Sequence, residues 1–204
     1  MDAVLLQRLA QITEEERELL QGRGVDRALY ASGRAFEVDA AKMLEKGKLM
    51  SIRPHTRFAP FPRHSHNYVE IMYMCLGKTV HRIDGDALVT LEAGELLFLN
   101  RHASHAIQRA DAGDIAVNFI VLPQFFDEAF NMAGMDNVLS RFLLGELYTG
   151  GAAVSYLHFR VREVLPVQNL VENMVWTLVN RQPGARRINQ VTMGLLLLQL
   201  MHYT

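Results

Sequence analysis

Cysteine is nearly absent from the sequence, since Cys75 is the only one among 204 residues. A single cysteine cannot form an intrachain disulfide, so the sequence excludes a disulfide-stapled fold and favours a reducing compartment. An excess of one charge is also lacking: 21 Lys and Arg balance 22 Asp and Glu, and the formal net charge is −1. This balance excludes the broad basic surface of a protein that wraps nucleic acid. We therefore do not expect residues 1–204 alone to bind duplex DNA specifically.

Long hydrophobic runs are missing as well. The densest, at 195–198, falls far short of the roughly 20 residues that a membrane-spanning helix needs. No basic region followed by an apolar stretch opens the chain, so we expect no signal peptide. Half of the residues (50%) are nevertheless hydrophobic, which is typical of a packed globular protein. We therefore expect a soluble cytoplasmic protein.

Apolar residues recur at helical spacing at the start of the chain, and at every second residue from about 48 to 121. Residues 4–21 have apolar side chains at helical spacing, and Thr13 with Glu16 matches a capping box that starts a second short helix. Asp84-Gly85 is the strongest hairpin signal in the period-two region. The strands expected there are 49–53, 68–76, 79–83, 87–91, 96–99, 105–109 and 115–122. Many short strands at intervals of about 8–12 residues predict a mainly β fold, an antiparallel barrel or sandwich.

After Pro123, which suits the first turn of a helix, the pattern is helical again. Helices are expected near 124–133 and 136–147, and near 166–180 and 186–203 at the end. Between them, 154–161 alternates and is expected to return to the sheet with its odd-numbered apolar side inward. The predicted organisation is an N-terminal helical extension (1–47), a barrel (48–161) with a helical insertion (123–147), and C-terminal helices (162–204).

The last of these helices has leucine or methionine on every side of its helical wheel. A helix that is apolar all round is buried, so it either packs under the barrel or presents part of its surface to a second subunit or a further domain. On the second interpretation we expect Leu197→Glu or Leu200→Glu to weaken a homodimer without unfolding the barrel.

Histidines are concentrated in one stretch of the chain. Six of the eight lie between 55 and 105: His55, His64, His66, His81, His102 and His105. Alternate residues of a strand point to the same face, so His64, His66 and Glu70 are expected to share one side. Two imidazoles and a carboxylate are suitable ligands for Zn, Ni or Fe(II). Met72 has the same parity and is a candidate ligand contact, although filling of the core is the preferred explanation.

The order of these residues resembles a known motif. His64-x-His66-x3-Glu70-x6-Gly77 matches the first cupin motif, His-x-His-x3-Glu-x6-Gly, while Phe58 stands where that motif has its leading glycine.

The second cupin motif is matched in part. Gly94 and His105 fit it, whereas Asn100, His102 and Arg109 replace its proline, glycine and asparagine. The resemblance implies a cupin-like double-stranded β-helix, that is, a jelly roll with flanking α-helices. In metal-binding cupins the positions that match His64, His66, Glu70 and His105 hold the metal.

The sequence around these motifs, HSHNYVEIMYMCLG followed by IDGDALVTLEAGELLFLNRHASHAI, resembles the sensing domain of AraC-family regulators. The resemblance covers about residues 50–125, and the two closing helices match the family's arrangement. It implies a domain that binds a small effector, forms a homodimer through its C-terminal helices, and activates or represses transcription through a DNA-binding helix-turn-helix domain that residues 1–204 do not include.

Two interpretations of the histidines remain open at this point. They either line a cavity as hydrogen-bonded polar groups, with Glu70 and Met72, or hold a divalent transition metal (Zn, Ni or Fe). His81 and His158 are expected at the surface or on strands. We expect no enzymatic activity; the alternative is a free-standing metal-dependent cupin enzyme, an Fe(II) dioxygenase or an isomerase, using His64, His66, Glu70 and His105 as ligands.

Overall fold

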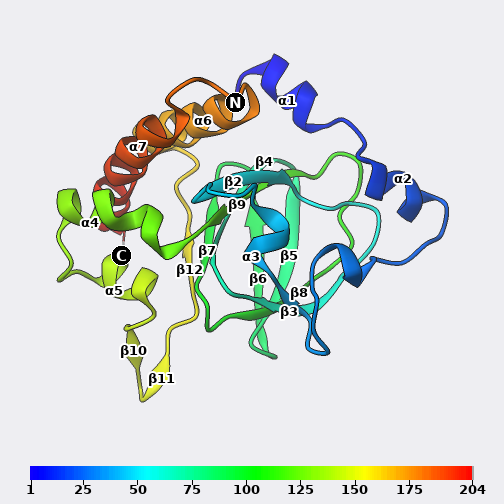
Figure 1. Ribbon diagram of the computed structural model, residues 1–204, viewed down its shortest axis with the longest axis horizontal. Coiled ribbons are helices and arrows are strands. Elements are labelled where there is room, and N and C mark those ends of the chain that lie inside the picture. The colour runs from blue at the N-terminus through cyan, green and yellow to red at the C-terminus, as the bar shows by residue number, and fades with distance from the viewer. Residues whose placement is uncertain (204) are drawn as a thin grey trace.

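The computed structural model describes residues 1–203 and has two five-stranded sheets packed face to face, with helices at both ends of the chain (Figure 1). One sheet has the order β1 (Glu37–Val38), β3 (Phe61–His66), β8 (Ser104–Ile107), β5 (Lys78–Ile83), β6 (Ala87–Glu92). The other has the order β12 (Tyr156–Phe159), β7 (Leu96–Leu99), β4 (Val69–Leu76), β9 (Ile115–Val121), β2 (Met50–Pro54). Within residues 1–203 only β1 and β3 pair in parallel. The expected antiparallel cupin-type sandwich with flanking helices is confirmed.

The turns that the sequence indicated form as expected. Asp84 and Gly85, with φ of 49° and 98°, form the tight connection between β5 and β6, where positive φ matches the twist of the strands. The strand at 154–161 is β12, which pairs antiparallel with β7. Strand β3 was not expected: it precedes β4 as a separate element, and residues 67–68 turn the chain between them.

The second sheet is buried on both faces, and its two faces contribute to different cores. Odd-numbered residues of β4 and β9, such as Ile71 and Phe119, pack against the helices. Even-numbered residues, such as Met72 and Met74, point into the sandwich and pack with Leu97 and Leu91. Each strand therefore positions polar groups inside the sandwich while its other face anchors the helical layer.

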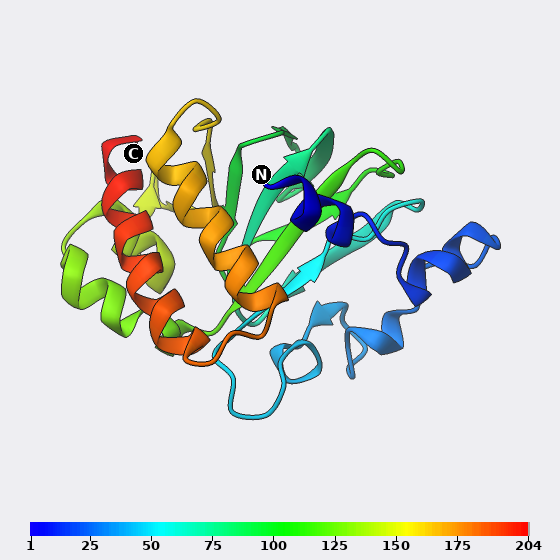
Figure 2. The same cartoon turned by 90° about the horizontal axis from the view of Figure 1, so that it is seen from above.

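Helices cover one side of the sandwich. They are α4 (Asp127–Ala133), α5 (Val138–Leu144), α6 (Leu165–Val179) and α7 (Ala185–Leu200), with 3-10 turns η2 (Pro123–Phe126) and η3 (Met201–Tyr203) and a small hairpin of β10 (Tyr148–Thr149) and β11 (Ala152–Ala153). Figure 2 shows α6 and α7 side by side along the sheet, and α7 also packs against α4. Pro123 lies in the first turn of η2, as predicted.

The assignment of Leu197 and Leu200 to a dimer surface is wrong. Their exposed fractions are 1% and 0%, and both belong to the core beneath the helices. Val191 and Leu195 are the apolar residues of α7 at the surface, 39% and 43% exposed. A helical wheel that is apolar all round cannot say which side the neighbouring helices cover.

The N-terminal segment lies across the sandwich. It contains α1 (Ala3–Leu9), α2 (Glu14–Leu20), η1 (Arg27–Leu29) and α3 (Ala40–Met43). Thr13 and Glu16 form the predicted capping box at the start of α2. The same Glu16 carboxylate also binds the buried Arg57, with Nε to Oε1 at 2.7 Å, and this ion pair joins α2 to the sandwich. Among residues 1–203, no helix is both long and apolar enough to cross a bilayer.

Candidate functional site

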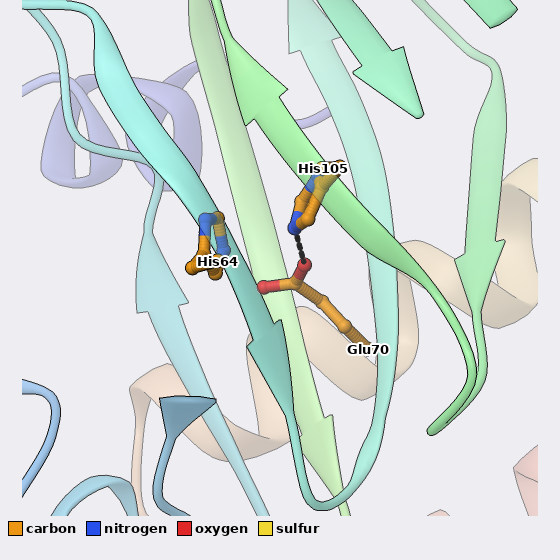
Figure 3. A group of neighbouring side chains, drawn as sticks. All are labelled: His64, Glu70 and His105. Carbon is orange, nitrogen blue, oxygen red and sulfur yellow. Dashed lines mark ion pairs between the residues drawn. The ribbon is translucent and has the colours of Figure 1, made fainter. Parts of the chain in front are cut away.

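The site is assembled from both sheets of the sandwich. His64 on β3 and His105 on β8 are direct partners in the strand register, and their ring centroids lie 4.2 Å apart. Glu70 comes from β4 in the opposite sheet, and its Oε2 lies 3.3 Å from Nε2 of His105 (Figure 3). One donor atom from each of the three residues lies within 4.8 Å of the other two, and all three side chains are buried. This geometry is compatible with a metal ion.

His66 lies at the edge of this group. Its Nε2 is 4.0 Å from Oε2 of Glu70, and its ring centroid is 5.8 Å from that of His105. The structure therefore brings together the four residues that the sequence singled out, three of them in a compact group and His66 beside it.

His64, His66 and Glu70 converge for a different reason from the one that their spacing predicted. The parity argument placed His64, His66 and Glu70 on one strand, but the two histidines lie on β3 and Glu70 lies on β4. Side chains of one strand two or four residues apart would only line up along it. Glu70 meets the histidines because the chain turns at 67–68 and enters the other sheet, which places the carboxylate opposite them.

Backbone carbonyls fix the two histidine rings of β3. Nδ1 of His64 lies 2.9 Å from the carbonyl oxygen of Pro62, and Nδ1 of His66 lies 2.9 Å from that of Tyr68. A carbonyl only accepts, so in each ring Nδ1 carries the proton and Nε2 keeps its lone pair. An imidazole held in this way is the usual form of a metal-ligating histidine.

Polar atoms without partners gather at the centre of the site. Within residues 1–203 the buried atoms that form no hydrogen bond include Nε2 of His66, both ring nitrogens of His105 and Oε2 of Glu70, although Nε2 of His105 and Oε2 of Glu70 face each other at 3.3 Å. The other oxygen of Glu70 accepts a hydrogen bond of 3.0 Å from Nδ2 of Asn118, which orients the carboxylate. Buried polar atoms normally find partners, and a nitrogen- and carboxylate-rich set suits Zn, Fe or Ni. The residues present therefore fit a divalent transition metal.

Burial and mutual charge shift the protonation of the site. Burial, with the neighbouring charge of His105, lowers the pKa of His64 to about 3. Burial would raise the pKa of Glu70, but the opposing interactions with His105, His66 and His64 outweigh it and hold that pKa below its ordinary value. At neutral pH the Glu70 carboxylate thus lies beside the neutral imidazole of His64, and a metal requires these protonation states of both groups.

Three further polar residues adjoin the site. His81, expected at the surface or on a strand, lies on strand β5; it is fully buried, and its ring stacks on His105 at 5.8 Å. The alternation of β5 carried this signal, because His81 shares its parity with Thr79 and Ile83, which point inward. His55 and Asn118 were not predicted as site residues; β9 is buried on both faces, so Asn118 gave no periodic signal.

A cavity of about 40 Å³ adjoins the histidines. Its walls include His55, His64, Glu70 and Asn118 from the sandwich, and Tyr30 and Val38 from the N-terminal segment that covers it. That volume has room for about three water molecules or an ion. Met72 packs in the apolar cluster of the interior and is not among the cavity walls, so its role as a ligand contact stays a prediction.

The departures from the cupin motifs leave this geometry intact. Phe58, at the position of the leading glycine, has a φ of 72°, the left-handed conformation that glycine adopts without strain. Asn100, at the position of the proline, is buried, and its Nδ2 donates to the carbonyls of Phe142 and Val154 at 3.1 and 2.8 Å. These bonds hold the turn before β8, and His105 still points into the sandwich.

Residues 51–130 match the family model described as the AraC-like ligand binding domain. This segment is similar to AraC-like ligand-binding domains. The match spans β2 to β9 and includes all four candidate ligands, so the resemblance drawn from the sequence motifs is confirmed. No curated protein matches the chain significantly.

Several solved structures are similar to parts of this chain. An apo ToxT variant from Vibrio cholerae is 12% identical over 74% of this chain and 55% of its own, with a TM-score of 0.54. An oxalate decarboxylase with Mn(II) centres from Bacillus subtilis is 17% identical over 37% of this chain and 22% of its own (TM-score 0.32). A cupin protein from Bacteroides fragilis is 28% identical over 36% of this chain and 64% of its own (TM-score 0.30). The chain thus spans about half the length of ToxT, and this likeness concerns the fold.

Proposed function

We propose that this chain is the effector-sensing and dimerisation part of an AraC-type transcription regulator, with a small ligand or a metal held inside the cupin sandwich at 48–161. The observation that carries the proposal is a buried cluster of unsatisfied polar atoms beside a cavity in an AraC-like domain. DNA would be bound through a further domain, because residues 1–204 have no net positive charge.

The cavity also suggests how an effector acts. About 40 Å³ is far below the roughly 300–1,000 Å³ of typical small-molecule sites. An effector larger than a few atoms therefore has to displace the covering segment that carries Tyr30 and Val38. Because that segment continues into α1 and α2, its displacement changes how the helices pack, and this shift in population is the proposed signal.

The metal is tested by removing one ligand at a time. We expect the chelator-treated protein to bind about one Zn²⁺ per chain, and His64→Gln to weaken binding by at least about tenfold. Isothermal titration calorimetry measures both. His158→Gln is the matched control, because Nε2 of His158 binds Glu95 at 2.8 Å outside the cluster. Equal Zn²⁺ affinity in wild type and His64→Gln would contradict the metal and leave a purely hydrogen-bonded cavity.

Dimerisation through the C-terminal helices (162–204) is tested by replacing two leucines of α7. Leu195→Glu places a charge on the exposed face of the helix and is expected to weaken a homodimer with little change in the free energy of unfolding. Leu197→Glu buries a charge in the core and is expected to lower the free energy of unfolding by more than about 3 kcal/mol. Sedimentation velocity and thermal melts separate the two effects. A monomeric wild type would contradict the proposed interface.

The alternative function is a metal-dependent cupin enzyme, and the convergence of His64, Glu70 and His105 favours it. An Fe(II)-loaded oxygenase consumes O2 in the presence of its substrate, whereas a sensing domain does not. Oxygen uptake by the iron-loaded protein with small organic acids therefore distinguishes the two, and uptake that His64→Gln abolishes would favour the enzyme.

A further inference from the structure

We propose that the start of α7 forms a second small-molecule site, separate from the histidine cavity, for a single-ring aromatic hydroxy acid. The site is a cavity of about 150 Å³ between the 47–50 loop, Phe125 of η2, the end of α6 and the start of α7. It shares no lining residue with the histidine cavity. The proposal does not depend on the nature of the effector in the sandwich.

Asn189 is the main observation. It lines this cavity, is only 1% exposed, and neither its Oδ1 nor its Nδ2 has a hydrogen-bond partner within residues 1–203. Leaving a buried amide unsatisfied costs about 1–3 kcal/mol, so such a group normally has a partner. A partner for both atoms must accept one hydrogen bond and donate another. A hydroxyl group does both.

Positive charge lies at the same cavity. Lys48 and Arg186 are among its lining residues; Lys48 pairs with Glu45 at 3.0 Å, whereas Arg186 forms no ion pair in the described part of the chain. The helix α7 begins at Ala185, and no side chain caps it. The amino end of a 16-residue helix carries partial positive charge and binds anions. A carboxylate is the group that these three features favour.

The size and walls of the cavity define the rest of the ligand. Leu49, Phe125, Leu178 and Ala185 supply apolar surface. A protein cavity of about 150 Å³ with apolar walls accommodates benzene. One aromatic ring between these walls, with a hydroxyl at Asn189 and a carboxylate at Arg186, therefore satisfies every group that the cavity presents.

The probe that tests the site is 4-hydroxybenzoate, compared with benzoate, which lacks the hydroxyl, and with 4-hydroxybenzyl alcohol, which lacks the charge. Isothermal titration calorimetry on the metal-free protein is expected to give one site per chain for 4-hydroxybenzoate. Each of the other two compounds is expected to bind at least about tenfold more weakly, because one charge-assisted or buried hydrogen bond is lost.

Variants of neighbouring residues locate the binding. Arg186→Ala and Asn189→Leu are each expected to weaken binding by at least about tenfold. Arg187→Ala is the matched control on the same helix, because Arg187 pairs with Glu128 and does not line the cavity. Thermal melts check folding, and Asn189→Leu is expected to be at least as stable as wild type because it removes an unsatisfied amide.

Three results would overturn the proposal. One is the absence of binding by the wild type, which would mean that buried water alone satisfies Asn189. The second is binding that Arg186→Ala and Asn189→Leu leave unchanged. The third is binding that His64→Gln abolishes, because it would place the ligand in the histidine cavity instead.

Discussion

Replacing Arg57 by alanine is expected to lower the free energy of unfolding by about 3–5 kcal/mol, because it leaves one charge of a buried ion pair alone. The Arg57 and Glu16 side chains are 4% and 1% exposed, and two charge-assisted hydrogen bonds of 2.7 and 2.9 Å join them. The guanidinium also donates to the backbone carbonyls of Ala10, Gln11 and Ala112. Without it the Glu16 carboxylate is buried with no counter-charge, and these carbonyls lose their donor.

Urea denaturation followed by circular dichroism measures this loss. Arg17→Ala is the matched control: Arg17 pairs with Glu14 on the exposed surface of α2, where an ion pair contributes roughly 0–1 kcal/mol. A double variant, Glu16→Leu with Arg57→Met, is expected to be less destabilised than Arg57→Ala, because no lone charge remains. A loss below about 1 kcal/mol in Arg57→Ala would show that α2 is not held to the sandwich by this pair.

Acidification from pH 6.5 to 5 is expected to destabilise the metal-free protein strongly, and His55 alone contributes about 2 kcal/mol of this loss. Burial lowers the pKa of His55 from 6.5 to about 4. Below pH 6.5 His55 becomes protonated in the unfolded chain, whereas in the folded protein it stays neutral until about pH 4. The stabilisation from neutral His55 is therefore complete above pH 6.5 and is lost as the pH falls toward 4. His64, with a pKa lowered to about 3, acts in the same direction.

Denaturant midpoints in the presence of a chelator, at pH 6.5 and pH 5, measure this dependence. His55→Gln removes one titrating group and is expected to reduce the loss of free energy between the two pH values by about 2 kcal/mol. His102→Gln is the control, because His102 is exposed. An unchanged pH dependence in His55→Gln would mean that the pKa of His55 is the same in the folded and the unfolded protein.

The amino-acid sequence by itself determined the features that depend on adjacent residues. The capping box of Thr13 and Glu16, the turn at Asp84-Gly85 and the first turn at Pro123 all formed as predicted. Each depends on backbone hydrogen bonds or φ preferences within a few residues, which the local sequence specifies completely. The period of two likewise determined the mainly β sandwich.

The sequence predicted which four residues form the candidate site, but not which strands bring them together. The cupin spacing identified His64, His66, Glu70 and His105, yet the histidines and the glutamate come from opposite sheets. His81 and Asn118 were missed as site residues, because their place beside the others depends on how β5 and β9 pair with distant strands. Alternation gives the face of a residue within its strand, but not which other strands that face meets.

Tertiary packing also decided which leucines of α7 are buried. Leu195 and Leu197 are equivalent in the sequence, but α4 and α6 cover only the side that carries Leu197. The same packing buries Asn189 without a partner, although asparagine is usually exposed. Burial is a property of the surfaces that meet, and one of these surfaces, that of α4, lies more than fifty residues before α7 in the chain. The local sequence therefore determined where each helix and strand forms, and only the tertiary structure determined which side chains they enclose.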